Sequence, residues 1–154
     1  MAVKNKTFIQ ALTLVAAVAL GYLLWLSWRP VEIVAVHQRD HFSDVLVKSF
    51  PVTDRGKITW WLENKERLKA SYHIPKPASY GGYTITFWLF GEGYKERGKY
   101  DRLCFDDMQR EKNCIEKEAV FAVRHYNSKK TYFIVFDGRY LLKDNGEIVE
   151  VPRD

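Results

Sequence analysis

An uninterrupted apolar segment near the N-terminus constrains this chain more than any other feature. Residues 8–28 form a run of 21 residues without a charge, in which Gln10, Thr13 and Ser27 are the polar interruptions. As a helix rising about 1.5 Å per residue, this run would cover the ~30 Å hydrocarbon core of a bilayer. A small soluble domain has no means of burying a helix that is apolar on every side. The sequence therefore predicts a transmembrane helix.

A cleaved secretory signal is the alternative interpretation of the same segment. Lys4 and Lys6 would form its basic region, and residues 17–19 (Ala-Val-Ala) would form its cleavage site. The apolar run, however, continues beyond this site to Trp28 and is followed by Arg29. Aromatic and basic residues of this kind settle at the interface of a bilayer. We therefore expect a retained anchor.

The two cysteines indicate the compartment in which the rest of the chain lies. Cys104 and Cys114 flank a polar stretch and are ten positions apart. This spacing suits a disulfide that closes a short loop. The alternative is a pair of free thiols in a cytosolic domain. Because disulfides persist in oxidising compartments such as the bacterial periplasm, we expect the cysteine-containing part to be periplasmic.

The charges around the apolar segment point to the same orientation. Two lysines precede the segment and a single arginine follows it closely, which slightly favours a cytoplasmic N-terminus. We expect a single-pass protein of the bacterial inner membrane. Its parts are a cytoplasmic tail at 1–7, a transmembrane anchor at 8–28 and a periplasmic globular domain at 31–154.

The pattern after the anchor predicts an α+β fold. A cap signal at Thr53 or Asp54 precedes apolar residues at helical spacing, so we expect a helix over about 54–72. Runs of β-forming residues alternate with turn signals such as Asp137-Gly138 and predict six to eight short strands. We expect a mostly antiparallel sheet with one main helix covering one of its faces.

Charge argues against a nucleic-acid-binding protein. Three of the 24 basic residues and none of the 19 acidic ones precede Val31, so residues 31–154 carry a formal charge of only +2. The basic residues in this part do not form the clustered patch that contacts with phosphates require. We therefore expect no nucleic-acid partner.

Catalytic and metal-binding motifs are also missing from the sequence. It contains no nucleophile elbow, no phosphate-binding loop, no dinucleotide-binding fingerprint and no zinc-protease signature. His37 and His41, with Asp40 and Asp44 nearby, offer ligand types for a metal, but this segment has the pattern of a strand and a turn. A solvated loop explains them better. We expect no catalytic residue, no metal and no cofactor.

Several residues are candidates for contact with a partner protein. Asp106 and Asp107 are adjacent in the loop between the cysteines, where a catalytic or cation-binding pair is the weaker interpretation. Tyr94 and Tyr100 lie in a glycine-rich stretch typical of an adaptable recognition loop or of a plain twisted hairpin. Trp60 lies off the apolar stripe of the expected helix, so it either packs beneath a loop or forms an exposed anchor for a partner.

Five segments carry a resemblance to a known family. They are 21–38 (GYLLWLSWRPVEIVAVHQ), 57–65 (KITWWLENK), 74–81 (IPKPASYG), 99–108 (KYDRLCFDDM) and 113–117 (NCIEK). Together they resemble a family of enterobacterial putative membrane proteins of uncharacterised function. The resemblance implies an enteric bacterial source and a membrane location, and it transfers no catalytic or binding residue.

These features favour a binding function over an enzymatic one. Small anchored domains of this kind are similar to immunity proteins, which protect a bacterium from toxins, and the expected partner is then a toxin. The alternative is an accessory subunit or sensor of an envelope complex, and a periplasmic enzyme using Asp106 or Asp107 is the weaker third possibility. The second expected partner is the lipid bilayer, which residues 8–28 would enter.

Overall fold

The structure, a computed structural model, describes residues 2–127 and 129–152. The chain forms two compact units, residues 1–30 and residues 31–154. The first unit contains the long helix α1 (Ala2–Trp28), which begins before the apolar segment identified in the sequence. Within the described residues, its Lys4–Leu26 stretch is the one helix long and apolar enough to cross a membrane, with a mean hydropathy of 2.0.

The C-terminal end of α1 carries the aromatic and basic residues of a membrane interface. The rings of Tyr22 and Trp25 lie 6.1 Å apart. The guanidinium of Arg29 lies 5.0 Å from the centre of the Trp25 ring, a cation–π distance. Indole rings and arginine side chains are enriched where a helix leaves the hydrocarbon core, so this end of α1 has the composition of an interface anchor.

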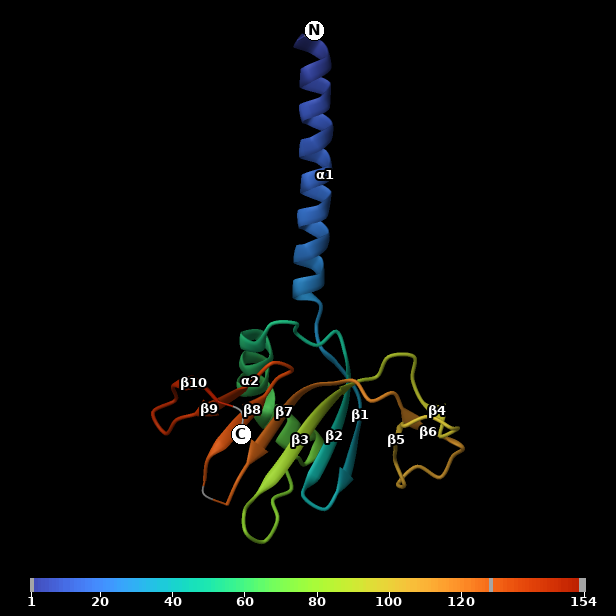
Figure 1. Ribbon diagram of the computed structural model, residues 1–154, viewed down its shortest axis with the longest axis vertical. Coiled ribbons are helices and arrows are strands. Elements are labelled where there is room, and N and C mark those ends of the chain that lie inside the picture. Colours follow the sequence, from blue (N-terminus) through green and yellow to red (C-terminus); the bar gives the residue numbers. More distant parts are fainter. Residues whose placement is uncertain (1, 128, 153–154) are drawn as a thin grey trace. The chain divides into compact units, whose positions relative to one another are not determined.

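The second unit is built on a seven-stranded sheet in the order β1-β2-β3-β7-β8-β9-β10 (Figure 1). All neighbouring strands pair antiparallel except β2 and β3, which run parallel. A parallel pair needs a long crossover, and α2 (Asp54–Tyr72) provides it. The strands are β1 (Glu32–Arg39), β2 (Phe42–Lys48), β3 (Tyr83–Leu89), β7 (Ala119–His125), β8 (Thr131–Ile134), β9 (Arg139–Leu142) and β10 (Ile148–Val151).

Local sequence signals set both ends of α2. The Thr53 hydroxyl accepts a hydrogen bond from the Gly56 amide at 3.0 Å, which satisfies one of the free amides of the first turn. At the other end His73 adopts the left-handed conformation, with φ of 58°, and its amide bonds back to Lys69. The α+β class, the mostly antiparallel sheet and the main helix predicted from the sequence are confirmed.

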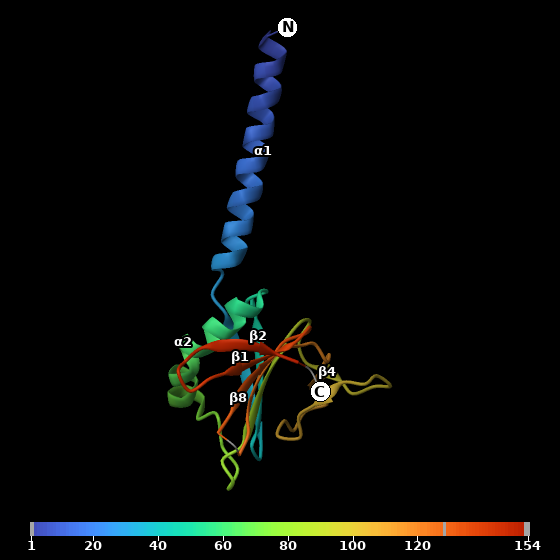
Figure 2. The same ribbon diagram turned by 60° about the vertical axis from the view of Figure 1, so that its left-hand side comes forward.

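The main hydrophobic core lies between α2 and one face of the sheet (Figure 2). Ile58, Trp61 and Leu68 of α2 are buried. They meet aromatic residues of the central strands, among which Phe87 and Phe133 are fully buried. Burying aliphatic and aromatic side chains of this size contributes roughly 1.5–3 kcal/mol each, so this layer supplies much of the driving force for folding.

Trp60 is partly buried and packs against this core, which favours the interpretation that it packs beneath a loop over that of an exposed anchor for a partner. Its indole lies 5.3 Å from the Phe50 ring and 5.6 Å from the Phe87 ring, both at edge-to-face angles. Phe50 belongs to the segment that connects β2 to α2. Because this segment folds over the helix, it covers a position that the helical stripe alone would leave outside the core.

On the opposite face of the sheet, the part formed by β1, β2 and β3 is covered by residues 90–118, which we call the disulfide lobe (Figure 2). Successive side chains of a strand alternate between faces, so Leu46 of β2 points away from the core that holds Val45 and Val47. Leu46 packs instead against Phe105 and Ile115 of the lobe. Since β2 is covered on both faces, Val45, Leu46 and Val47 are all fully buried.

Candidate binding site

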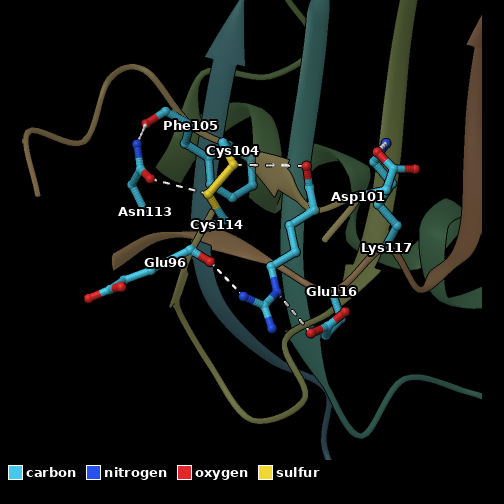
Figure 3. Close-up of a disulfide and its surroundings, with 9 residues drawn as sticks. Glu96, Asp101, Cys104, Phe105, Asn113, Cys114, Glu116 and Lys117 are labelled. Atoms are coloured by element: carbon cyan, nitrogen blue, oxygen red, sulfur yellow. Dashed lines mark hydrogen bonds and ion pairs between the residues drawn. A yellow bond between two sulfur atoms is a disulfide. The ribbon is translucent and has the colours of Figure 1, made fainter. Parts of the chain in front are cut away.

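The disulfide lobe contains a small sheet of its own, in the order β4-β6-β5. Its strands are β4 (Lys95–Glu96), β5 (Leu103–Cys104) and β6 (Lys112–Ile115). Cys104 and Cys114 lie directly opposite each other on β5 and β6. Their sulfur atoms are 2.02 Å apart and form a disulfide, the pairing that the sequence predicted (Figure 3).

Ion pairs surround the disulfide on the lobe surface. The Arg102 guanidinium donates to the Glu116 carboxylate at 3.0 Å and to the Glu96 carbonyl at 2.6 Å. This guanidinium lowers the pKa of Glu116 below its ordinary value. Lys117 and Asp101 form a further pair at 2.8 Å (Figure 3). Ion pairs at a protein surface add little to stability, so they order the lobe surface more than they stabilise the fold.

His37 joins the sheet to the disulfide lobe. Its Nδ1 lies 2.8 Å and 2.9 Å from the two carboxylate oxygens of Asp107. Its Nε2 lies 2.9 Å from the Tyr94 hydroxyl. The imidazole stacks on the Phe105 ring, with centroids 3.8 Å apart, and His37 is only 8% exposed. We call His37, Asp107, Tyr94 and Phe105 the His37 cluster.

Both protonation states of His37 satisfy this geometry. In the neutral ring, Nδ1–H donates to Asp107 while Nε2 accepts from the Tyr94 hydroxyl. In the charged ring, both nitrogens donate, and the Asp107 carboxylate supplies the opposite charge. The cluster therefore holds the lobe on strand β1, and both nitrogens of the His37 ring have hydrogen-bond partners. Tyr94 is fixed by this contact, while one edge of Asp107 stays in contact with solvent.

A pocket of about 110 Å³ opens beside the cluster. Strand β1 contributes His37, Gln38 and Arg39 to its wall, β2 contributes Asp44, and the lobe contributes residues 103–107. Three carboxyl groups and one guanidinium thus face a cavity with room for a few water molecules or one small side chain. The pocket therefore brings polar groups of β1, β2 and the lobe to one place.

Asp44 is held in the wall of this pocket by a neighbouring strand. The Trp88 indole N–H donates to its carboxylate at 2.8 Å. Burial raises the pKa of Asp44 above its ordinary value, and the Trp88 hydrogen bond and the charge of Arg39 only partly oppose this. The folded domain therefore favours the protonated form of Asp44 more than the unfolded chain does.

We predict that Asp44→Asn stabilises the domain at neutral pH. The amide oxygen keeps an acceptor for Trp88, while the variant removes a charge that burial disfavours. Folding raises the pKa of Asp44, so this residue makes its full contribution to the free energy of unfolding at low pH. That contribution is lost as the pH rises through the pKa of the folded state. The variant's advantage in chemical denaturation should therefore be larger at about pH 7 than at about pH 4. An equal difference at both pH values would contradict this account.

The sequence-predicted partner residues divide into three groups. Tyr94, Asp106 and Asp107 come together at the His37 cluster and its pocket. Tyr100 lies elsewhere on the lobe, 69% exposed, with the Arg102 guanidinium 4.6 Å from its ring. Trp60 packs against the core on the other face of the sheet.

Sequence reasoning missed the roles of His37 and Asp44. The four-residue spacing of His37 and His41 suggested a shared site, yet the partner of His37 is Asp107, 70 positions away. His41 instead lies within 3.3 Å of the Tyr80 hydroxyl. Among the described residues, no group of three or more His, Cys, Asp or Glu side chains is arranged to hold a metal ion.

A helix long and apolar enough to cross a membrane precedes an α+β domain in this chain. The chain belongs to the family described as enterobacterial putative membrane protein (DUF943), whose model matches residues 2–152. The resemblance found in the sequence is thereby confirmed over nearly the whole chain. No curated protein and no solved structure matches it.

Proposed function

We propose that this protein is a single-pass inner-membrane protein whose periplasmic domain binds another protein at the pocket beside the His37 cluster. In this proposal, residues 8–28 anchor the chain, residues 1–7 lie in the cytoplasm and the domain at 31–154 acts by binding and not by catalysis. The observation that carries the proposal is the His37 cluster itself. In this cluster a buried histidine holds the charged disulfide lobe in one position beside an open pocket.

The chemistry of the pocket supports binding more than catalysis. The Tyr94 hydroxyl and both nitrogens of His37 are engaged with one another and with Asp107. Burial raises the pKa of Tyr94, which keeps its hydroxyl protonated and makes it a poor nucleophile. The other polar groups that line the pocket are carboxylates, one guanidinium and the Gln38 amide, and charged and polar groups give a protein interface its specificity.

An immunity protein that neutralises a toxin is the leading form of this function. It would need a site on the outer side of the membrane, a rigid frame and no chemistry, and the disulfide lobe offers the frame. An accessory subunit or sensor of an envelope complex is the alternative. Deleting the gene separates the two: loss of resistance to a toxin made by sibling cells supports immunity, while a defect in an envelope process without such sensitivity supports the accessory role.

Reporter fusions test the predicted topology. We expect a reporter that is active only in the periplasm to give signal when fused after Asp154, and a reporter active only in the cytoplasm to give none. The purified mature protein should retain its N-terminal residues, as mass spectrometry would determine. A cytoplasmic signal would overturn the orientation, and a mature chain starting near Leu20 would overturn the anchor.

A further inference from the structure

Two side chains stand out on the surface of the domain. Val52 is 91% exposed and Phe136 is 89% exposed, the two highest values among the large hydrophobic residues described outside α1. Single exposed hydrophobic residues are common on protein surfaces. The position of these two in the fold is what makes them informative.

Both residues lie at the end of the sheet where β1 begins. Glu32, the first residue of β1, pairs with Lys48 at the end of β2, and Val52 follows four residues later. Strand pairing continues across the sheet to β8 and β9. There Ile134 pairs with Arg139, and these two residues flank the turn that contains Phe136. Because neighbouring strands alternate in direction except for β2 and β3, these positions share one end of the sheet.

A hydrogen bond joins the two segments. The Tyr140 hydroxyl of β9 donates to the Asp54 carboxylate at the start of α2, at 3.0 Å. Asp54 is two residues from Val52, and Tyr140 is four residues from Phe136. The twist of a sheet would turn distant strands apart, but this bond holds the start of β9 against the start of α2. We call the corner formed by Val52 and Phe136 the exposed apolar corner.

The short connection to α1 identifies the surface that this corner meets. Arg29, Pro30 and Val31 are the residues that separate α1 from β1. A three-residue connection spans about 10 Å, so the start of β1 stays near the surface of whatever membrane α1 crosses. A valine and a phenylalanine carry no charge and suit the boundary between headgroups and acyl chains.

We infer that Val52 and Phe136 insert into the headgroup region of the bilayer that α1 crosses, so that the domain rests on the membrane at the exposed apolar corner. This inference rests on the proposed anchoring by α1. Its consequence is orientation: the opposite end of the sheet, with the β1–β2 turn and Tyr80, faces away from the lipid.

Spin-label accessibility in vesicles tests the inference. The full chain is reconstituted into vesicles of phosphatidylethanolamine and phosphatidylglycerol after Val52→Cys or Phe136→Cys, with Tyr80→Cys as the matched control. Because Cys104 and Cys114 are bonded to each other, the introduced thiol takes the label. We expect labels at 52 and 136 to collide more with lipid-soluble oxygen than with an aqueous nickel chelate, and the label at 80 to show the reverse.

A second experiment avoids the apolar character that a label adds when it replaces Val52 or Phe136. A label placed by Asp137→Cys should be protected from the chelate when Val52 and Phe136 are intact and should become accessible after Val52→Glu and Phe136→Glu. Carbonate extraction of the same vesicles reports on the anchor. Protein retained in the vesicles with water-accessible labels at 52 and 136 would overturn this inference alone, whereas protein extracted by carbonate would overturn the anchoring and this inference together.

Discussion

Trp60→Ala is expected to lower the free energy of unfolding of the domain by about 3 kcal/mol, the lower end of the range for aromatic truncation in a core. The indole packs between Phe50 and Phe87, so its removal leaves a cavity and withdraws two edge-to-face ring contacts. Alanine is the best helix former, so the loss is not due to helix propensity. Chemical denaturation followed by circular dichroism measures the effect.

Tyr100→Ala is the matched control for this prediction. Tyr100 is an aromatic residue of the lobe that is 69% exposed, and we expect its truncation to change stability by less than about 0.5 kcal/mol. Equal effects of the two substitutions would show that Trp60 does not pack as described. Unchanged stability in Trp60→Ala would restore the interpretation of this residue as a surface anchor.

Opening the disulfide between Cys104 and Cys114 is expected to cost about 2–3 kcal/mol, as for other short loops. The loss should extend beyond the lobe surface, because Tyr94 and Asp107 reach His37 from the same lobe. Denaturation of Cys104→Ser beside the wild type measures the loss, and the reduced wild-type protein is the control that keeps every side chain. Cys114 is fully buried, so a serine at that position would add the burial of a hydroxyl to the loss of the bond.

Two outcomes would contradict this account of the lobe. Free thiols at both cysteines in protein extracted from cells without reductant would show that the bond does not form there. A reduced protein as stable as the oxidised one would show that the lobe is held by the His37 cluster and its apolar contacts alone.

Local signals explain how much of the fold could be predicted. The helix at 54–72 was predicted over the range that α2 occupies, because a cap signal at Thr53 marks its start and the apolar residues after it keep helical spacing. The Asp137-Gly138 turn separates β8 from β9, as this dipeptide predicted. Such signals act between neighbours, and the sequence displays them directly.

Long-range pairings account for the features that could not be predicted. The parallel pairing of β2 with β3 depends on α2 crossing the sheet, and no local pattern specifies it. His37 meets Asp107 across 70 positions because the lobe folds over β1 and β2. Trp60 was ambiguous for the same reason, since Phe50 covers it from outside the helix. Asp106, Asp107 and Tyr94 were identified individually, but their convergence on one histidine was not.

Photo-crosslinking in living cells tests most directly the central claim that the domain binds a protein beside the His37 cluster. A photoreactive amino acid replaces Asp106, which is exposed and lines the pocket, and in the control it replaces Glu66 on the exposed side of α2. We expect irradiation to join the chain at position 106 to one protein of defined mass that position 66 does not capture. His37→Gln in the same background should weaken that product. No product at 106, or the same products from both positions, would contradict the claim.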